Sequence, residues 1–156
     1  GRELFDTTRL QIDVEGRTVH ALSPSETPRG ERLPLTTQHG IESLPVKVNG
    51  TTALAEVDFG NGSKVMVSRA LADRLKLKVT GTSVGGGIGG AITRETVLLR
   101  SLKVGPLTLR NVPAAIDELP NAGEVNIGTA VLRRFVVTTD FRNHLVWLAP
   151  VKRASR

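Results

Sequence analysis

The sequence has 156 residues, the length expected of one domain, so we expect a single hydrophobic core. Its composition, 39% hydrophobic and 23% charged, is typical of a folded globular chain, and no apolar run approaches the roughly 18 residues that a bilayer-spanning helix requires. The net charge is +6, yet the basic residues are dispersed and only 3% of residues are aromatic, so we expect no nucleic-acid partner, and no membrane partner within this fragment. Nucleic-acid binding by the basic second part of the chain is a weaker hypothesis.

The chain contains no Cys, which excludes disulfide bonds, thiolate zinc sites and cysteine nucleophiles. The three histidines, His20, His39 and His144, are scattered, and no acidic loop has the spacing of a calcium site, so we expect neither a metal nor a cofactor. The sequence begins with Gly1 rather than Met, so we expect a processed chain or a fragment, with any targeting segment upstream. The compartment stays open, with a periplasmic or secreted location slightly favoured over a cytoplasmic one.

The opening of the sequence resembles its end, because residues 1–24 lie over residues 128–150 with one residue dropped in a turn. The identical pairs are Gly1 and Gly128, Asp13 and Asp140, Leu22 and Leu148, and Pro24 and Pro150. Each copy predicts a short helical turn, a strand, a turn and a second strand that ends at Pro. Residues 1–24 are therefore interpreted as the closing segment of a truncated upstream copy of one domain.

The two closing segments lead to an assembly prediction. Isolated hairpins are marginal and an edge strand seeks a partner, so residues 9–22 and 136–148 are expected to pair in one sheet, within a chain or across a two-fold axis. Asp13 and Asp140 precede the turns in both copies and are expected to be turn acceptors.

Between these copies, residues 25–40 are rich in Ser, Thr, Pro and Gly and predict a linker, followed by a domain over 41–150 and a basic tail over 151–156. The domain opens with strands at Leu44–Val48 and Ala53–Val57, joined by an Asn49-Gly50 hairpin turn. Ser68 is typical of a helix N-cap and predicts a helix over Arg69–Leu77. Further strands are predicted over Lys64–Val67, Thr80–Val84, Ala91–Arg100, Leu102–Val104, Leu107–Leu109 and Val112–Ile116, with Pro106 and Pro113 at edges or turns. The fold class is therefore mainly β, with one short helix.

The candidate site begins where the second strand ends, at Val57-Asp58-Phe59-Gly60. A carboxylate between an apolar strand and a Gly-containing turn is held by packing on one side and exposed on the other, and turn amides can bond to its oxygens. Taken alone, Asp-x-Gly is a weak motif that a plain β-turn explains better, because Asp and Gly are ordinary turn residues.

A glycine cluster, Gly85-Gly86-Gly87-Ile88-Gly89-Gly90, follows further along the chain. It contains G-x-G-x-x-G, but the following residues are β-branched and predict a strand, whereas a dinucleotide-binding loop must open a helix. A nucleophile elbow at Ser83 fails for the same reason. We expect instead a mobile glycine-rich hairpin whose tip covers an extended ligand above Asp58, with a loose surface loop as the alternative.

The third motif is Val125-Asn126-Ile127-Gly128, an apolar strand stopped by Gly and followed by a predicted short helix. Taken in order, VDFG, GGIGG and VNIG make the region from about Ile41 to Pro150 similar to the retropepsin-like aspartic proteases, of bacterial or retroviral type. The resemblance implies an acid-protease half-barrel with a glycine-rich flap. Together with the partial first copy, it suggests that this is the C-terminal copy of a tandem protein.

The resemblance also implies a mechanism and a set of site residues. Two Asp residues would share a proton around one water and hydrolyse a peptide bond in a peptide or protein substrate, with an acidic pH optimum. This chain would supply Asp58, and the other Asp would come from a dimer mate or from the upstream copy. Residues implied to bind substrate are Gly60 and the flap residues Gly86, Gly87, Ile88, Gly89 and Gly90.

Three positions depart from the family pattern. Phe59 stands where the family has Thr, Asn61 where a small residue is usual, and Thr129 where Arg is frequent. Phe59 and Thr129 motivate a second hypothesis from another class, a non-catalytic domain that dimerises or binds extended peptides in the same groove.

Overall fold

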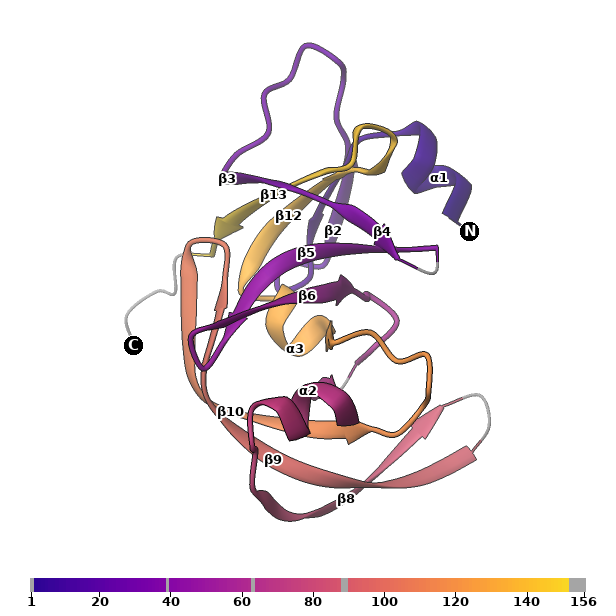
Figure 1. Ribbon diagram of the computed structural model, residues 1–156. Coiled ribbons are helices and arrows are strands. Elements are labelled where there is room, and N and C mark those ends of the chain that lie inside the picture. Colours follow the sequence, from indigo (N-terminus) through magenta and orange to yellow (C-terminus); the bar gives the residue numbers. More distant parts are fainter. Residues whose placement is uncertain (1, 39, 63, 88–89, 152–156) are drawn as a thin grey trace.

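The computed structural model describes residues 2–38, 40–62, 64–87 and 90–151 (Figure 1). Within them two sheets account for most of the chain. The first has five strands in the order β2 (Thr18–Ala21), β1 (Leu10–Asp13), β12 (Phe135–Asp140), β13 (Leu145–Pro150) and β3 (Glu31–Pro34). The second has eight strands in the order β4 (Thr36–Gln38), β5 (Ile41–Val48), β6 (Thr51–Val57), β11 (Val125–Ile127), β7 (Val65–Ser68), β10 (Leu107–Asp117), β9 (Gly90–Val104) and β8 (Val79–Gly87).

The eight-stranded sheet curls because β5 also pairs with β9, which brings strands from its two ends together. The described residues also form short helical elements, which are α1 (Arg2–Thr7), α2 (Arg69–Arg74), α3 (Thr129–Leu132) and the 3-10 turn η1 (Phe141–Asn143). The predicted class, mainly β with short helical structure, is confirmed, although the described residues hold three α-helices rather than one.

The predicted pairing of the two closing segments is confirmed within the single chain. Strand β1 runs antiparallel to β12, with Leu10 opposite Thr139 and Ile12 opposite Val137. As predicted, both acidic residues accept turn amides: Asp13 Oδ1 from Gly16 N at 2.8 Å, and Asp140 Oδ1 from Asn143 N at 3.3 Å.

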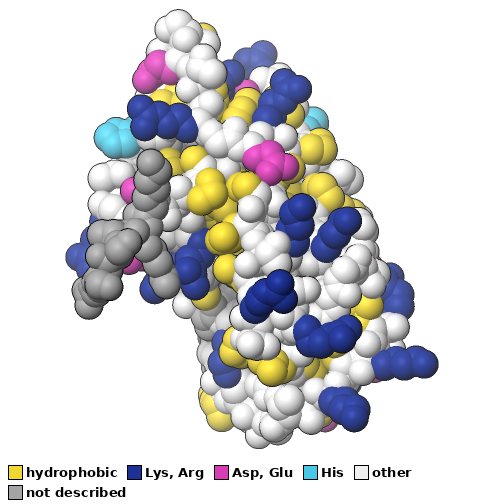
Figure 2. Space-filling model, turned by 90° about the vertical axis from the view of Figure 1, so that its left-hand side faces the viewer, with side chains coloured by type: hydrophobic (Ala, Val, Ile, Leu, Met, Phe, Trp, Pro, Cys, Tyr) yellow, Lys and Arg dark blue, Asp and Glu magenta, His cyan; other side chains and the backbone are white. Residues whose placement is uncertain are grey.

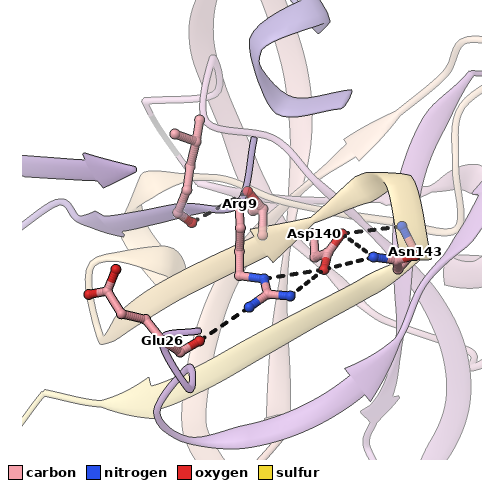
Figure 3. A network of polar contacts seen from close by, with 6 residues as sticks. Arg9, Glu26, Asp140 and Asn143 are labelled. Atoms are coloured by element: carbon pink, nitrogen blue, oxygen red, sulfur yellow. Dashed lines mark hydrogen bonds and ion pairs between the residues drawn. The ribbon is translucent and has the colours of Figure 1, made fainter. Parts of the chain in front are cut away.

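An ion pair joins the two segments beside this ladder (Figure 3). Arg9 bonds Asp140 Oδ2 through Nε at 3.3 Å and through Nη2 at 3.2 Å, and its Nη1 donates to the carbonyl oxygen of Glu26 at 3.2 Å. The guanidinium also lies 5.7 Å from the ring centre of Trp147. The described part of this segment, residues 2–24, is therefore packed against the rest of the fold.

The segment predicted as a linker contains two short strands. β3 pairs with β13, and β4 pairs with β5. Its residues carry little strand propensity of their own, and the open edges of the neighbouring strands supply the hydrogen bonds.

Other boundaries differ for local reasons. The predicted breaks within β9 and β10 are absent, and Pro113 lies inside β10 opposite Leu98. Pairing of β10 with β7 begins only at Ala114, so Pro113 precedes that ladder. Helix α2 ends at Arg74, short of Leu77, because Lys76 takes a left-handed conformation with φ 52°.

The core lies between β5, β6, β9, β10 and β12, and Leu44, Leu102, Ile127 and Phe135 are fully buried in it. In contrast to the apolar core, the outer face in Figure 2 carries Lys and Arg side chains, which are dispersed among polar and apolar side chains. On the exterior of this sheet Lys47 of β5 is directly opposite Lys103 of β9, and both are exposed. No helix among the described residues is long and apolar enough to cross a bilayer.

Candidate active site

Asp58 lies at the end of β6, as the sequence predicted. β6 runs parallel to β11, with Val57 beside Ile127, and the Asp58 amide donates to the Ile127 carbonyl oxygen at 3.1 Å. Val57 and Ile127 are buried in the core, so the backbone on both sides of the site is fixed by packing. The half-buried Asp58 side chain stands where the strand gives way to a turn.

The turn after β6 holds one oxygen of the carboxylate. Gly60 N donates to Asp58 Oδ1 at 2.8 Å, and Asn61 N donates to the same oxygen at 3.2 Å. Two amides on a single oxygen fix the orientation of the carboxylate. Gly60 thus contacts the predicted acid directly.

Asn126 holds the other oxygen, an interaction that the sequence analysis did not anticipate. Its Nδ2 donates to Asp58 Oδ2 at 3.0 Å and to Glu56 Oε2 at 3.2 Å, while its Oδ1 accepts from Asn61 Nδ2 at 2.8 Å. Asn126 therefore connects two carboxylates and the turn. The sequence signal was a polar residue inside an otherwise apolar strand.

Gly128, the last residue of VNIG, fits tightly against the Asp58 turn. A Cβ at this position would lie 2.1 Å from the Asn61 carbonyl oxygen, so no larger residue fits without movement. The next residue, Thr129, donates to the same oxygen from its amide at 2.8 Å and from its hydroxyl at 3.3 Å. The second and fourth residues of VNIG therefore both fix the loop that carries Asp58.

Phe59 points into an aromatic cluster. Its ring centre lies 6.5 Å from that of Phe5 in α1, and Phe5 lies 5.5 Å from Phe141. These three residues are three of the five aromatic residues of the chain. Phe59, the residue after Asp58, thus contacts the N-terminal closing segment by apolar stacking. The family pattern has a hydroxyl-bearing Thr at this position.

The predicted glycine-rich hairpin is formed by β8 and β9, with Gly86 opposite Ala91 and Gly87 opposite Gly90. Ile88 and Gly89, also predicted to contact substrate, lie outside the described residues. In Figure 1 this hairpin extends to the same side of the molecule as the end of β6.

Arg69 ties the base of this hairpin to the body of the domain. Its guanidinium bonds Glu95 of β9 at 2.5 Å and also bonds Glu118, which follows β10. These hydrogen bonds raise the pKa of Arg69 above its ordinary value and hold the pKa of Glu118 below its own. The contacts are solvent-exposed, so they orient the hairpin more than they stabilise the fold.

Across the described ranges, no group of three or more His, Asp or Glu side chains is arranged to hold a metal ion. His20 lies on β2 and His144 follows η1.

Comparisons with known proteins agree with this geometry. A family model described as aspartyl protease matches residues 44–133, more than half of the chain. A search of curated protein sequences finds no significant match.

Solved structures share the fold at low sequence identity. A retropepsin-like aspartic protease from Rickettsia conorii is 17% identical, with a TM-score of 0.53, covering 78% of this chain and 95% of that one. EIAV protease in complex with the inhibitor HBY-793 is also 17% identical, with a TM-score of 0.51, covering 63% of this chain and 90% of that one. The family match establishes that this chain belongs to the aspartyl protease family, and the solved structures show that it has the retropepsin-like fold.

Proposed function

We propose that the protein is an aspartic endopeptidase in which Asp58 is one of two catalytic carboxyl groups. The observation that carries this proposal is the way Asp58 is held. Among the described residues, Oδ1 accepts two turn amides and Oδ2 accepts the Asn126 side-chain amide, at the end of a strand whose other face is core.

The proposed reaction needs a pair of carboxyl groups around one water. One carboxylate removes a proton from the water as the water attacks the peptide carbonyl carbon, and the protonated partner donates a hydrogen bond to the carbonyl oxygen. Collapse of the tetrahedral intermediate breaks the C–N bond, and the leaving amine takes up a proton. Two like charges so close cannot both ionise, which predicts activity at acidic to mildly acidic pH.

The second Asp is proposed to come from an upstream copy of the domain. The inner edge of β12 would be the natural contact between two identical chains, but β1 of the same chain already occupies it. β1 belongs to the segment whose sequence repeats that of α3, β12 and β13. The rest of an upstream copy of the domain, placed before α1, would therefore face Asp58 across the same sheet. A homodimer through this edge requires displacement of residues 1–24.

A non-catalytic, peptide-binding domain is the alternative, favoured by Phe59. Its ring stacks on Phe5 and cannot supply the hydroxyl that the family pattern has at this position. In that case the groove would bind extended peptides without cleaving them.

The test compares the 156-residue chain with a longer protein that carries a second copy before it. Both are incubated with unstructured peptide libraries between pH 3 and pH 8, roughly the range over which a shared carboxyl proton is lost. Cleavage by the longer protein alone supports the tandem site, and cleavage by the isolated chain supports a homodimer. Binding without cleavage in both supports the alternative.

A further inference from the structure

A second acidic side chain lies beside Asp58. Glu56 and Asp58 are two residues apart along β6, so their side chains share one face of the strand, and both accept a hydrogen bond from the Nδ2 atom of Asn126. The Glu56 carboxylate is therefore separated from the proposed catalytic carboxylate by a single amide nitrogen.

Glu56 is buried without a cation. Its side chain is 9% exposed, and no described Lys, Arg or His forms an ion pair with it. Gly123 lies against it so closely that a Cβ there would be 2.4 Å from Glu56 Oε1, so backbone covers the carboxylate on that side. Buried carboxylates are normally paired with a positive charge.

Ser43 supplies an independent sign of a missing ligand. It is directly opposite Glu56 on the neighbouring strand β5, so the two side chains lie on the same face. Ser43 is 1% exposed, and its hydroxyl oxygen has no hydrogen-bond partner. A buried hydroxyl left unpaired is costly and calls for an explanation.

Ser43, Glu56 and Asn126 form one polar row across β5, β6 and β11 that leads to Asp58. From this row we infer that Glu56 and Ser43 accept hydrogen bonds from a cationic substrate side chain, Lys or Arg, next to the bond that is cleaved. The inference rests on the proposed peptidase function and names its substrate class. A carboxylate and a hydroxyl oxygen suit an ammonium or guanidinium donor, and the net charge of +6 would otherwise repel such a peptide.

The test uses pairs of peptides that differ only by Lys or norleucine at one position beside the cleaved bond. We expect the Lys peptide to have about a tenfold or greater advantage in kcat/KM, the size of one charge-assisted hydrogen bond. Glu56→Gln should bring the ratio near one. Glu31→Gln, an exposed change on β3 with the same loss of charge, should leave the ratio as it is.

Calorimetric binding to the Asp58→Asn chain repeats the comparison without catalysis. Selective binding of the Lys peptide that Glu56→Gln removes would support the inference even if no peptide is cleaved. Cleavage without a Lys preference, or a preference that survives Glu56→Gln, would overturn the inference and leave the peptidase proposal standing. Absence of any preference in both assays would also overturn it.

Ser43→Ala distinguishes binding from a structural role. Removing an unpaired buried hydroxyl should leave the melting temperature equal or higher while lowering the Lys preference. A lower melting temperature with an unchanged preference would show that the hydroxyl serves the fold.

Discussion

Gln11 and Thr138 are directly opposite each other at the centre of a ladder that has local two-fold symmetry. In the self-comparison of the sequence, Leu10 corresponds to Val137 and Ile12 to Thr139. In the structure Leu10 pairs with Thr139, and Ile12 pairs with Val137, so the corresponding residues exchange partners. This is the relation expected between two copies of one unit about a two-fold axis.

Removal of residues 1–24 tests that relation. The deletion exposes the edge of β12 and removes the buried side chains of Leu10 and Ile12, so we expect a lower melting temperature and self-association through the freed edge. Light scattering and thermal unfolding measure both effects. Val19→Ala, at a side chain that is 62% exposed, serves as the control and should change stability by less than about 0.5 kcal/mol. A truncated chain that is equally stable and monomeric would refute the interface.

Gly128→Ala should destabilise the fold by about 1–3 kcal/mol or more, because the new methyl group collides with the Asn61 carbonyl oxygen. The Asp58 loop must then move, so we also expect reduced activity. Gly62→Ala is the matched control, since nothing lies within 4 Å of a Cβ there. Chemical denaturation of the two variants should separate them clearly, and equal stability would contradict the packing described.

The Phe5 and Phe59 stack should couple the N-terminal segment to the Asp58 turn. A double-mutant cycle with Phe5→Leu and Phe59→Leu is expected to give a coupling energy of about 0.5–1.5 kcal/mol. Phe59→Thr restores the hydroxyl of the family pattern, which on sequence grounds should preserve or raise activity. Because it also removes the stack, we expect it to lower the free energy of unfolding. Additive single effects would show that the rings do not interact.

The Arg69 ion pairs predict a pH-dependent contribution to the free energy of unfolding. Arg69 holds the pKa of Glu118 below its usual value of about 4.5, so the pair stabilises the folded chain at neutral pH. The contribution is lost as pH falls through the lowered value and Glu118 becomes protonated. The stability difference between wild type and Arg69→Met should therefore shrink in acid and in high salt. Arg110→Met, at an exposed residue that forms no ion pair with another described residue, should show no such trend. Thermal unfolding at several pH values measures the stability difference between wild type and Arg69→Met. A difference that stays constant with pH would contradict the role given to the Arg69 and Glu118 ion pair.

The sequence predicted what depends on local signals. Asp58 before a Gly turn, the Asn49-Gly50 hairpin and the Ser68 cap all rest on residues close in the chain, and Ser68 accepts the Leu71 amide at 3.2 Å. The pairing of β1 with β12 was also predictable, because the repeat itself carries the information.

What the sequence did not predict depends on contacts between distant residues. Strands β3 and β4 form because edges of β13 and β5 are open to them. Asn126 and Asp58 are 68 residues apart in the sequence, and the contact between Phe5 and Phe59 depends on the packing of the N-terminal segment. No periodicity or turn rule encodes such contacts.

The most direct test of the central claim is the effect of Asp58→Asn on peptide cleavage. Steady-state kcat/KM is measured at acidic pH with a peptide that the wild-type protein cleaves, and Asp73→Asn, at a side chain that is 69% exposed, is the control for loss of one negative charge. We expect Asp58→Asn to keep its melting temperature to within a few degrees and to lose activity by at least about a thousandfold. Asp73→Asn should cleave at nearly the wild-type rate. Cleavage by Asp58→Asn at a rate close to that of the wild type would place the chemistry elsewhere and contradict the account.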